Sequence, residues 1–214
     1  MARKVSIGYQ DFREIISGHF FYIDKTPFIR EWWESGDKVT LIIRPRRFGK
    51  TLTMSMLEQF FSIGSTEGSD LFRDLKIWQY PAYRRLQGTL PVISLTFANV
   101  KERTFSMTRQ RINQILTDLY NKHEFLLEGD LLTKKEKAYF RSVDIQMDEP
   151  TATMGLHNLS DYLSRYYGKK VLILLDEYDT PMQEAYVDGY WDELTAFLRS
   201  LFNATFKTNP YLER

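Results

Sequence analysis

The sequence lacks three features that would each point to a particular class of protein. It contains no cysteine, which excludes disulfides and thiolate metal sites. Its formal net charge is only +1, so the chain as a whole does not indicate nucleic-acid binding, and any site for a polyanion must be local. Its longest purely aliphatic run, residues 171–175, is far too short to cross a bilayer.

The N-terminal segment also lacks the mark of a secreted protein. The first residues, MARKVSIGYQDF, are basic but do not contain the apolar stretch of a signal peptide. Together with the short aliphatic runs, this leads us to expect a soluble, cytoplasmic protein that has no membrane partner.

What is present indicates a globular α/β protein. The 214 residues are 43% hydrophobic and 15% aromatic, enough for one full domain or for one domain with a small appendage. Three β-rich segments alternate with helical patterns, and this alternation predicts a parallel sheet with flanking helices. The expected strands are residues 38–43, 90–97 and 171–175, and the expected helices begin after Lys50, include residues 112–119, and span 154–167 and 191–206.

Two local patterns refine this expectation. Thr26 and Pro27 are typical of the start of a helix, and Gly36 of its end, so a short helix should precede the first strand. In the second strand Ile93, Leu95 and Phe97 alternate with polar residues, which indicates a strand less fully buried than the others.

The segment LIIRPRRFGKTLTM (residues 41–54) ends like a phosphate-binding loop. Gly49 would let the backbone approach a phosphate closely, Lys50 would lie between the terminal phosphates, and Thr51 would bind Mg²⁺. The usual motif has a glycine where this chain has Arg44, and Pro45 could start the turn in its place. The alternative is a solvated basic turn, and the loop taken alone does not decide between the two.

A second motif favours the nucleotide site. The aliphatic residues 171–175 run directly into Asp176 and Glu177, so a buried strand would deliver two carboxylates at its C-terminal edge. In that position Asp176 would hold Mg²⁺ through water and Glu177 would polarise the attacking water. A core strand that ends in a charged turn is the alternative, but both motifs in this order are much rarer by chance.

Three strings then resemble a known family. RPRRFGKT (residues 44–51), YIDKT (22–26) and LLDEYDTP (174–181) are similar to the signatures of the AAA-ATPase-like domain of many bacterial proteins. The resemblance covers nearly the whole chain and implies that Arg44 is the family's usual residue, that the ligands are ATP and Mg²⁺, and that the fold is a P-loop NTPase of the catalytic-glutamate (ASCE) type with strand order 5-1-4-3-2. Members often carry a C-terminal PD-(D/E)XK nuclease-like domain, but no nuclease residue is found in this sequence.

The resemblance also suggests how the first 36 residues take part. We expect residues 1–36 to pack on the nucleotide site and residues 37–214 to form the P-loop core, with Tyr22 near the base and Asp24 or Lys25 as a local latch. A helix cap with a surface ion pair explains Asp24 and Lys25 equally well. The candidate residues are Glu177 and Lys50 for catalysis; Arg46, Arg47, Phe48, Gly49, Lys50, Thr51, Leu52, Tyr22 and Asp24 for the nucleotide; and Thr51 and Asp176 for Mg²⁺.

The implied strand order contains a strand that the sequence does not supply. Strand 4 should lie between the loop strand and the acidic strand, yet the chain reaches FKTNPYLER (residues 206–214) before any such segment. We therefore expect an incomplete domain, truncated before strand 4, whose open sheet favours weak nucleotide binding, little hydrolysis and self-association. The functions that remain are Mg²⁺-dependent ATP hydrolysis, a nucleotide-gated switch or scaffold with little turnover, and a basic-loop nucleic-acid-binding domain.

Overall fold

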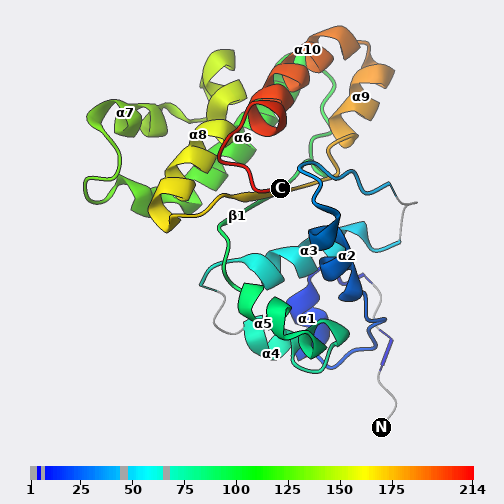
Figure 1. The fold of residues 1–214 in the computed structure, drawn as a ribbon. Coiled ribbons are helices and arrows are strands. Elements are labelled where there is room, and N and C mark those ends of the chain that lie inside the picture. The colour runs from blue at the N-terminus through cyan, green and yellow to red at the C-terminus, as the bar shows by residue number, and fades with distance from the viewer. Residues whose placement is uncertain (1–3, 6–7, 44–47, 65–67) are drawn as a thin grey trace. The chain divides into compact units, whose positions relative to one another are not determined.

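The structure, a computed structural model, describes residues 4–5, 8–43, 48–64 and 68–214. The chain divides into two compact units (Figure 1). The first lies within residues 1–92 and also includes Arg214, and the second consists of residues 93–213. Residues 8–36 and 48–51 thus belong to the same unit, and the expected division into residues 1–36 and 37–214 stays a prediction.

Short helices around an aromatic core make up the first unit. Phe12 stacks on Phe72 with ring centroids 5.0 Å apart, and Phe60 meets the edges of both Phe61 and Phe72 at about the same distance. All four side chains are fully buried. The helices are α1 (Phe12–Ser17), α2 (Pro27–Ser35), α3 (Lys50–Phe61), α4 (Gly68–Phe72) and α5 (Pro81–Leu86), and a 3₁₀ turn, η1 (Lys76–Gln79), precedes α5.

Helix α2 begins and ends where the sequence predicts. Pro27 occupies its first turn, and Gly36 ends it in the left-handed conformation with φ +74°. The last carbonyl groups of a helix have no partner within the helix. Here the guanidinium of Arg214 supplies donors, 3.0 Å from the Trp32 carbonyl oxygen and 2.6 Å from that of Trp33, and it lies 4.7 Å from the centroid of the Trp33 ring.

The prediction of a strand at residues 38–43, before the loop, is wrong. This segment is irregular, and the side chains of Val39, Leu41 and Ile43 are 58%, 57% and 83% exposed. A strand exists only when a second strand pairs with its backbone groups, and within the described ranges no strand pairs with this segment. A β-rich composition is therefore not sufficient to make this segment a strand. A 3.0 Å hydrogen bond from Trp32 Nε1 to Thr40 Oγ1 joins the segment to α2.

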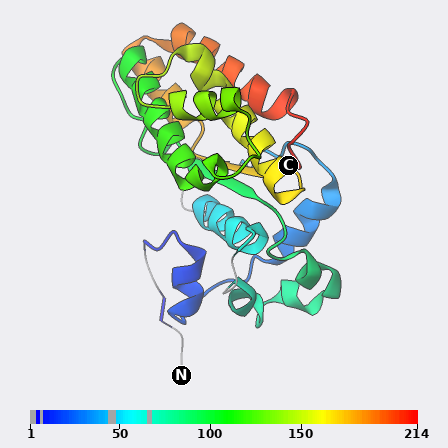
Figure 2. The same ribbon diagram turned by 90° about the vertical axis from the view of Figure 1, so that its left-hand side faces the viewer.

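The second unit packs its helices against two strands. Strands β1 (Val92–Thr96) and β2 (Leu172–Asp176) are neighbours in a two-stranded parallel sheet. In both views the helices α6 (Phe105–Lys122), α8 (Glu149–Tyr167) and α10 (Trp191–Phe202) lie on the same side of the strands (Figures 1 and 2). Their core includes Ile93, Leu95 and Phe97, so the alternation seen in the sequence is confirmed. The remaining helices are α7 (Lys134–Ser142) and α9 (Thr180–Asp188), with a 3₁₀ turn at Glu124–Leu127 and a π turn at Asn203–Lys207.

Strands β1 and β2 correspond to the expected strands 90–97 and 171–175, and their parallel pairing is compatible with an α/β fold. The strand order 5-1-4-3-2 and the truncation before strand 4 stay predictions. Two helices differ from expectation. Helix α8 begins at Glu149 rather than at residue 154, because Asp148 caps it by accepting the Thr151 N–H. Helix α9, with Pro181 in its first turn, lies in a stretch for which the sequence predicts no helix.

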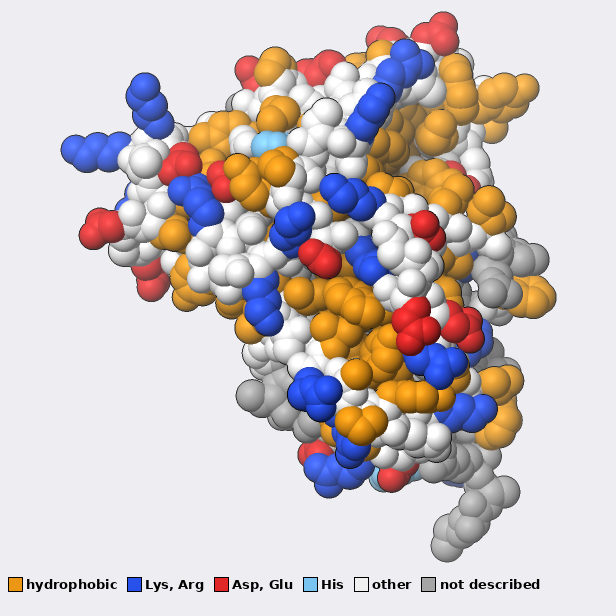
Figure 3. All heavy atoms as spheres, viewed as in Figure 1, with side chains coloured by type: hydrophobic (Ala, Val, Ile, Leu, Met, Phe, Trp, Pro, Cys, Tyr) orange, Lys and Arg blue, Asp and Glu red, His pale blue; other side chains and the backbone are white. Residues whose placement is uncertain are grey.

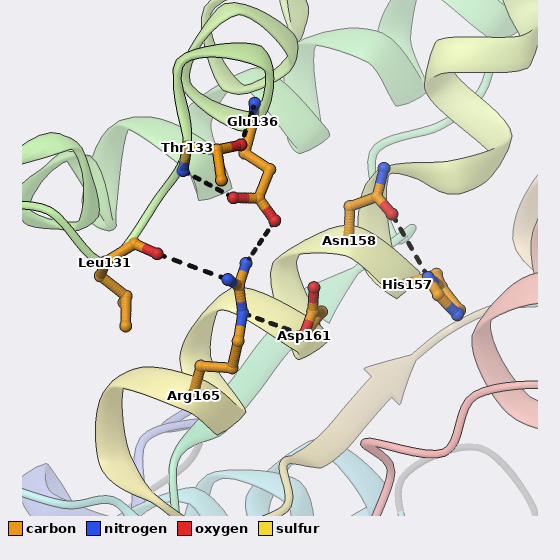
Figure 4. A network of polar contacts seen from close by, with 7 residues as sticks. All are labelled: Leu131, Thr133, Glu136, His157, Asn158, Asp161 and Arg165. Atoms are coloured by element: carbon orange, nitrogen blue, oxygen red, sulfur yellow. Dashed lines mark hydrogen bonds and ion pairs between the residues drawn. The ribbon is translucent and has the colours of Figure 1, made fainter.

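A polar cluster joins α7 to α8 (Figure 4). The guanidinium of Arg165 lies 2.7 Å from the Glu136 carboxylate and 3.2 Å from that of Asp161. Glu136 also closes a capping box with Thr133 at the start of α7. Donors around this carboxylate, first the Thr133 backbone N–H, lower the pKa of Glu136 below its ordinary value. The cluster thus fixes the charged excursion between α6 and α8 to the unit.

Candidate functional site

The centre of the candidate site is the start of helix α3. Gly49 precedes the helix with φ +77° and ψ 33°, in the left-handed region that glycine adopts without a steric cost. The Gly49 carbonyl oxygen accepts hydrogen bonds from the backbone N–H and the hydroxyl of Thr53, both at 2.9 Å. The N–H groups of the first turn have no acceptor within the helix and carry the positive end of its dipole. This is the backbone arrangement that phosphate groups bind.

The side chains of this turn include three of the predicted residues. Lys50, Thr51 and Leu52 are the first residues of α3 and are half-buried, while Phe48 is 60% exposed. The predicted residues Arg46 and Arg47 lie outside the described residues, as do Arg44 and Pro45. The described half of the loop therefore presents Gly49, the lysine and the threonine in the order that a phosphate site requires.

Tyr22 and Asp24 lie in the segment between α1 and α2. The hydroxyl of Tyr22 accepts the Lys25 backbone N–H at 3.2 Å and donates to Met56 Sδ of α3 at 3.5 Å. Burial raises the pKa of Tyr22 to about 12, so the hydroxyl stays protonated at neutral pH and remains a donor. Tyr22 thus fixes its segment against α3, and its contact with a base stays a prediction.

Asp24 acts as a latch. One carboxylate oxygen accepts the backbone N–H of Thr26 at 2.9 Å and the Thr26 hydroxyl at 2.6 Å. The other accepts the backbone N–H of Lys76, in η1, at 2.8 Å. The carboxylate therefore joins the start of α2 to a turn about fifty residues away along the chain. The Thr26 hydroxyl in turn accepts the N–H of Ile77 at 3.2 Å.

Lys25 brings this segment to the loop itself. Its ammonium donates to the carbonyl oxygen of Phe48 at 3.0 Å, although the two residues are 23 positions apart. The YIDKT string and the Gly-Lys-Thr string are thus neighbours in space. The resemblance suggests Asp24 or Lys25 as a local latch, but nothing in the sequence indicates contact between Lys25 and the loop.

The acidic pair lies in the second unit, at the end of β2. Asp176 is 9% exposed, and its carboxylate accepts the N–H of Glu177 at 3.0 Å. Its backbone carbonyl accepts the N–H of Phe97, which continues the pairing of β1 with β2. Glu177 has φ +51°, one of two positive values found at non-glycine residues in the described part of the chain. Its carbonyl and carboxylate both face Thr180 of α9, at 3.1 Å to the backbone nitrogen and 3.5 Å to the hydroxyl.

A non-glycine residue in the left-handed region is strained, and such strain is concentrated at functional sites. The strand therefore ends with a buried carboxylate followed by a half-buried one on a sharp backbone turn.

The residues present fit a phosphate chain with a divalent cation. At the start of α3, Gly49 adopts the left-handed conformation, Lys50 offers a positive charge, and the Thr51 hydroxyl is an oxygen ligand of the kind that Mg²⁺ prefers. Within the ranges that the structure describes, no helix is long and apolar enough to span a membrane.

Comparisons with known proteins agree with these motifs. A protein of Azotobacter chroococcum mcd 1, described as "Uncharacterized protein in vnfD 5'region", is 29% identical over 184 residues. The match covers 84% of this chain but only 30% of that protein, so the chain spans about a third of its relative's length. Comparison with solved structures gives no match. The sequence profile of the AAA-ATPase-like family, described as "Predicted AAA-ATPase", matches residues 6–214, and the chain therefore belongs to this family.

Proposed function

We propose that this chain binds ATP with Mg²⁺ at the start of helix α3 and hydrolyses it. The observation that carries the proposal is the left-handed Gly49 placed directly before Lys50 and Thr51 in the first turn of α3. Membership of the AAA-ATPase-like family supports nucleotide binding. Mg²⁺, when bound, would neutralise charge on the phosphates.

The roles of the chain's own residues follow from their chemistry. The α3 amides and Lys50 would hold the terminal phosphates, and Thr51 and Asp176 would orient the cation. Glu177 would accept a proton from the water whose oxygen attacks the γ-phosphorus, while the bond to the bridging oxygen breaks and ADP leaves with its electron pair. The strained backbone at Glu177 supports a functional role for this carboxylate.

Two other functions remain in competition. A switch or scaffold that binds ATP with little turnover needs Lys50 but not Glu177. A nucleic-acid-binding domain would need a basic surface, and on the face seen in Figure 3 Lys and Arg side chains are interspersed with Asp and Glu. That mixture, with a net charge of +1, favours the nucleotide functions. Self-association and a C-terminal nuclease-like domain in a longer protein stay predictions.

Two variants separate the alternatives. Lys50→Ala should abolish ATP binding or weaken it strongly, because it removes the charge that pairs with the phosphates. Glu177→Gln should keep Mg²⁺-dependent ATP binding and lose turnover, because an amide cannot act as a base. The measurements are titration of labelled ATP with and without Mg²⁺, and release of phosphate. ATP binding by Lys50→Ala equal to that of the parent would exclude the loop as the site, and unchanged hydrolysis by Glu177→Gln would exclude the role of Glu177.

A further inference from the structure

The charged side chain of Lys25 contacts the loop, and the proposed mechanism gives this contact no role. Its ammonium lies 3.0 Å from the Phe48 carbonyl oxygen and so close to Gly49 that a Cβ there would stand 2.9 Å from the nitrogen. The ammonium therefore lies against the residue whose conformation starts α3. An ammonium carries three N–H donors, and one of them bonds to the loop carbonyl.

The backbone of Lys25 is held by hydrogen bonds at both its N–H and its carbonyl group. Its backbone N–H donates to the Tyr22 hydroxyl at 3.2 Å, and its carbonyl accepts the Phe28 N–H at 3.0 Å. Immediately before it, Asp24 is latched to Thr26 and to η1. The backbone from which the side chain extends is therefore already ordered, so the contact with Phe48 costs the conformational entropy of the side chain alone.

The peptide that Lys25 contacts is the one that enters Gly49. Its carbonyl is the Phe48 oxygen, and the nitrogen of the same peptide belongs to Gly49. Because a peptide is planar, fixing its carbonyl direction also fixes the opposite direction of the N–H. A hydrogen bond from a cation is stronger than one between neutral groups, so this contact is suited to holding the orientation of that peptide.

We propose that Lys25 is a positioning residue of the phosphate site: its ammonium fixes the Phe48–Gly49 peptide, so that the amides that follow face the phosphates. The proposal rests on the proposed nucleotide function and adds a second lysine to it. Lys25 acts through the loop, in contrast to Lys50, which would touch the phosphates directly.

The test compares Lys25→Met with Lys25→Arg, and with Lys38→Met as a control. Lys38 is exposed and lies in the same unit, so its loss changes the net charge equally. Lys25→Met should weaken Mg-ATP binding by about tenfold or more, as expected for a charge-assisted hydrogen bond. Lys25→Arg keeps the charge and the donors and should recover most of that affinity, while Lys38→Met should match the parent.

Inorganic triphosphate, used as a competitor of labelled ATP, shows where Lys25 acts. It carries the phosphates without base or ribose, so a residue that positions the phosphate loop must affect it as strongly as it affects ATP. We expect the same loss of affinity for both in Lys25→Met, with an unchanged midpoint of thermal unfolding in the absence of ligand.

Three outcomes would overturn the proposal. ATP binding by Lys25→Met equal to that of the parent, when Lys50→Ala has lost it, leaves the nucleotide site intact and removes Lys25 from it. A loss for ATP but not for triphosphate moves Lys25 to the base or ribose. Absence of binding by the parent overturns the proposed function and this inference together.

Discussion

The backbone strain at Glu177 leads to a prediction about stability whose sign is unusual. With φ +51°, Glu177 holds a conformation that costs a residue with a Cβ about 1–2 kcal/mol and costs glycine almost nothing. In an ordinary conformation glycine is less stable than alanine by about 0.5–1 kcal/mol, because it loses more freedom on folding. The difference between these two effects favours Glu177→Gly over Glu177→Ala by up to about 1.5 kcal/mol.

Both variants lose the carboxylate, so the comparison isolates the backbone. Glu128 serves as the control site, because it is exposed and has φ −76°. There the order should be reversed, with Glu128→Ala more stable than Glu128→Gly. Thermal unfolding measures both pairs, and a difference of 1 kcal/mol corresponds to about 2–4 °C in a domain of 150–250 residues. If Glu177→Gly unfolds at a lower temperature than Glu177→Ala, Glu177 is not strained and its backbone conformation does not support a functional role.

The latch and the polar cluster lead to two further predictions. Asp24→Ala removes the acceptor of three hydrogen bonds and should lower the free energy of unfolding by about 2–3 kcal/mol, with a smaller loss in Asp24→Asn. Urea unfolding measures this free energy, and a value for Asp24→Ala equal to that of the parent would contradict the latch. The pKa of Glu136 is lower in the folded chain than in the unfolded one, so its contribution to stability is present above the unfolded value of about 4.5 and is lost as the pH falls through the folded value. Glu136→Gln should therefore show a weaker loss of stability between pH 5 and pH 3 than the parent, and identical acid profiles would contradict it.

Much of the second unit can be predicted from the sequence because its signals are local. The alternation at Ile93–Phe97 and the apolar run before Asp176 mark β1 and β2, and Gly168 ends α8 in the left-handed conformation. The start of helix α9 cannot be predicted in this way, because Thr180 and Pro181 are typical both of a turn and of a first helical turn. The sequence alone does not choose between these two structures.

In the candidate site, too, local signals can be predicted from the sequence and contacts between distant residues cannot. Gly49, Lys50 and Thr51 are recognisable because their spacing along the chain carries the chemistry. The contact of Lys25 with Phe48 joins residues far apart in sequence, and no periodicity reports it. At residues 38–43 the sequence predicts a strand that the structure does not have. The composition of the segment favours a strand, but a strand also needs a partner elsewhere in the chain.

The contact of Arg214 with the end of α2 has a consequence for the time course of folding. Its guanidinium reaches the Trp32 carbonyl across 182 residues of sequence. A ribosome that adds about 5–20 residues per second needs roughly 9–36 s to synthesise that length of chain. For this interval the nascent helix has its proline start and its glycine end but lacks its cationic cap. The first unit should therefore reach its final stability only after Arg214 has been synthesised, and chains arrested before that residue should be more open to proteolysis at α2.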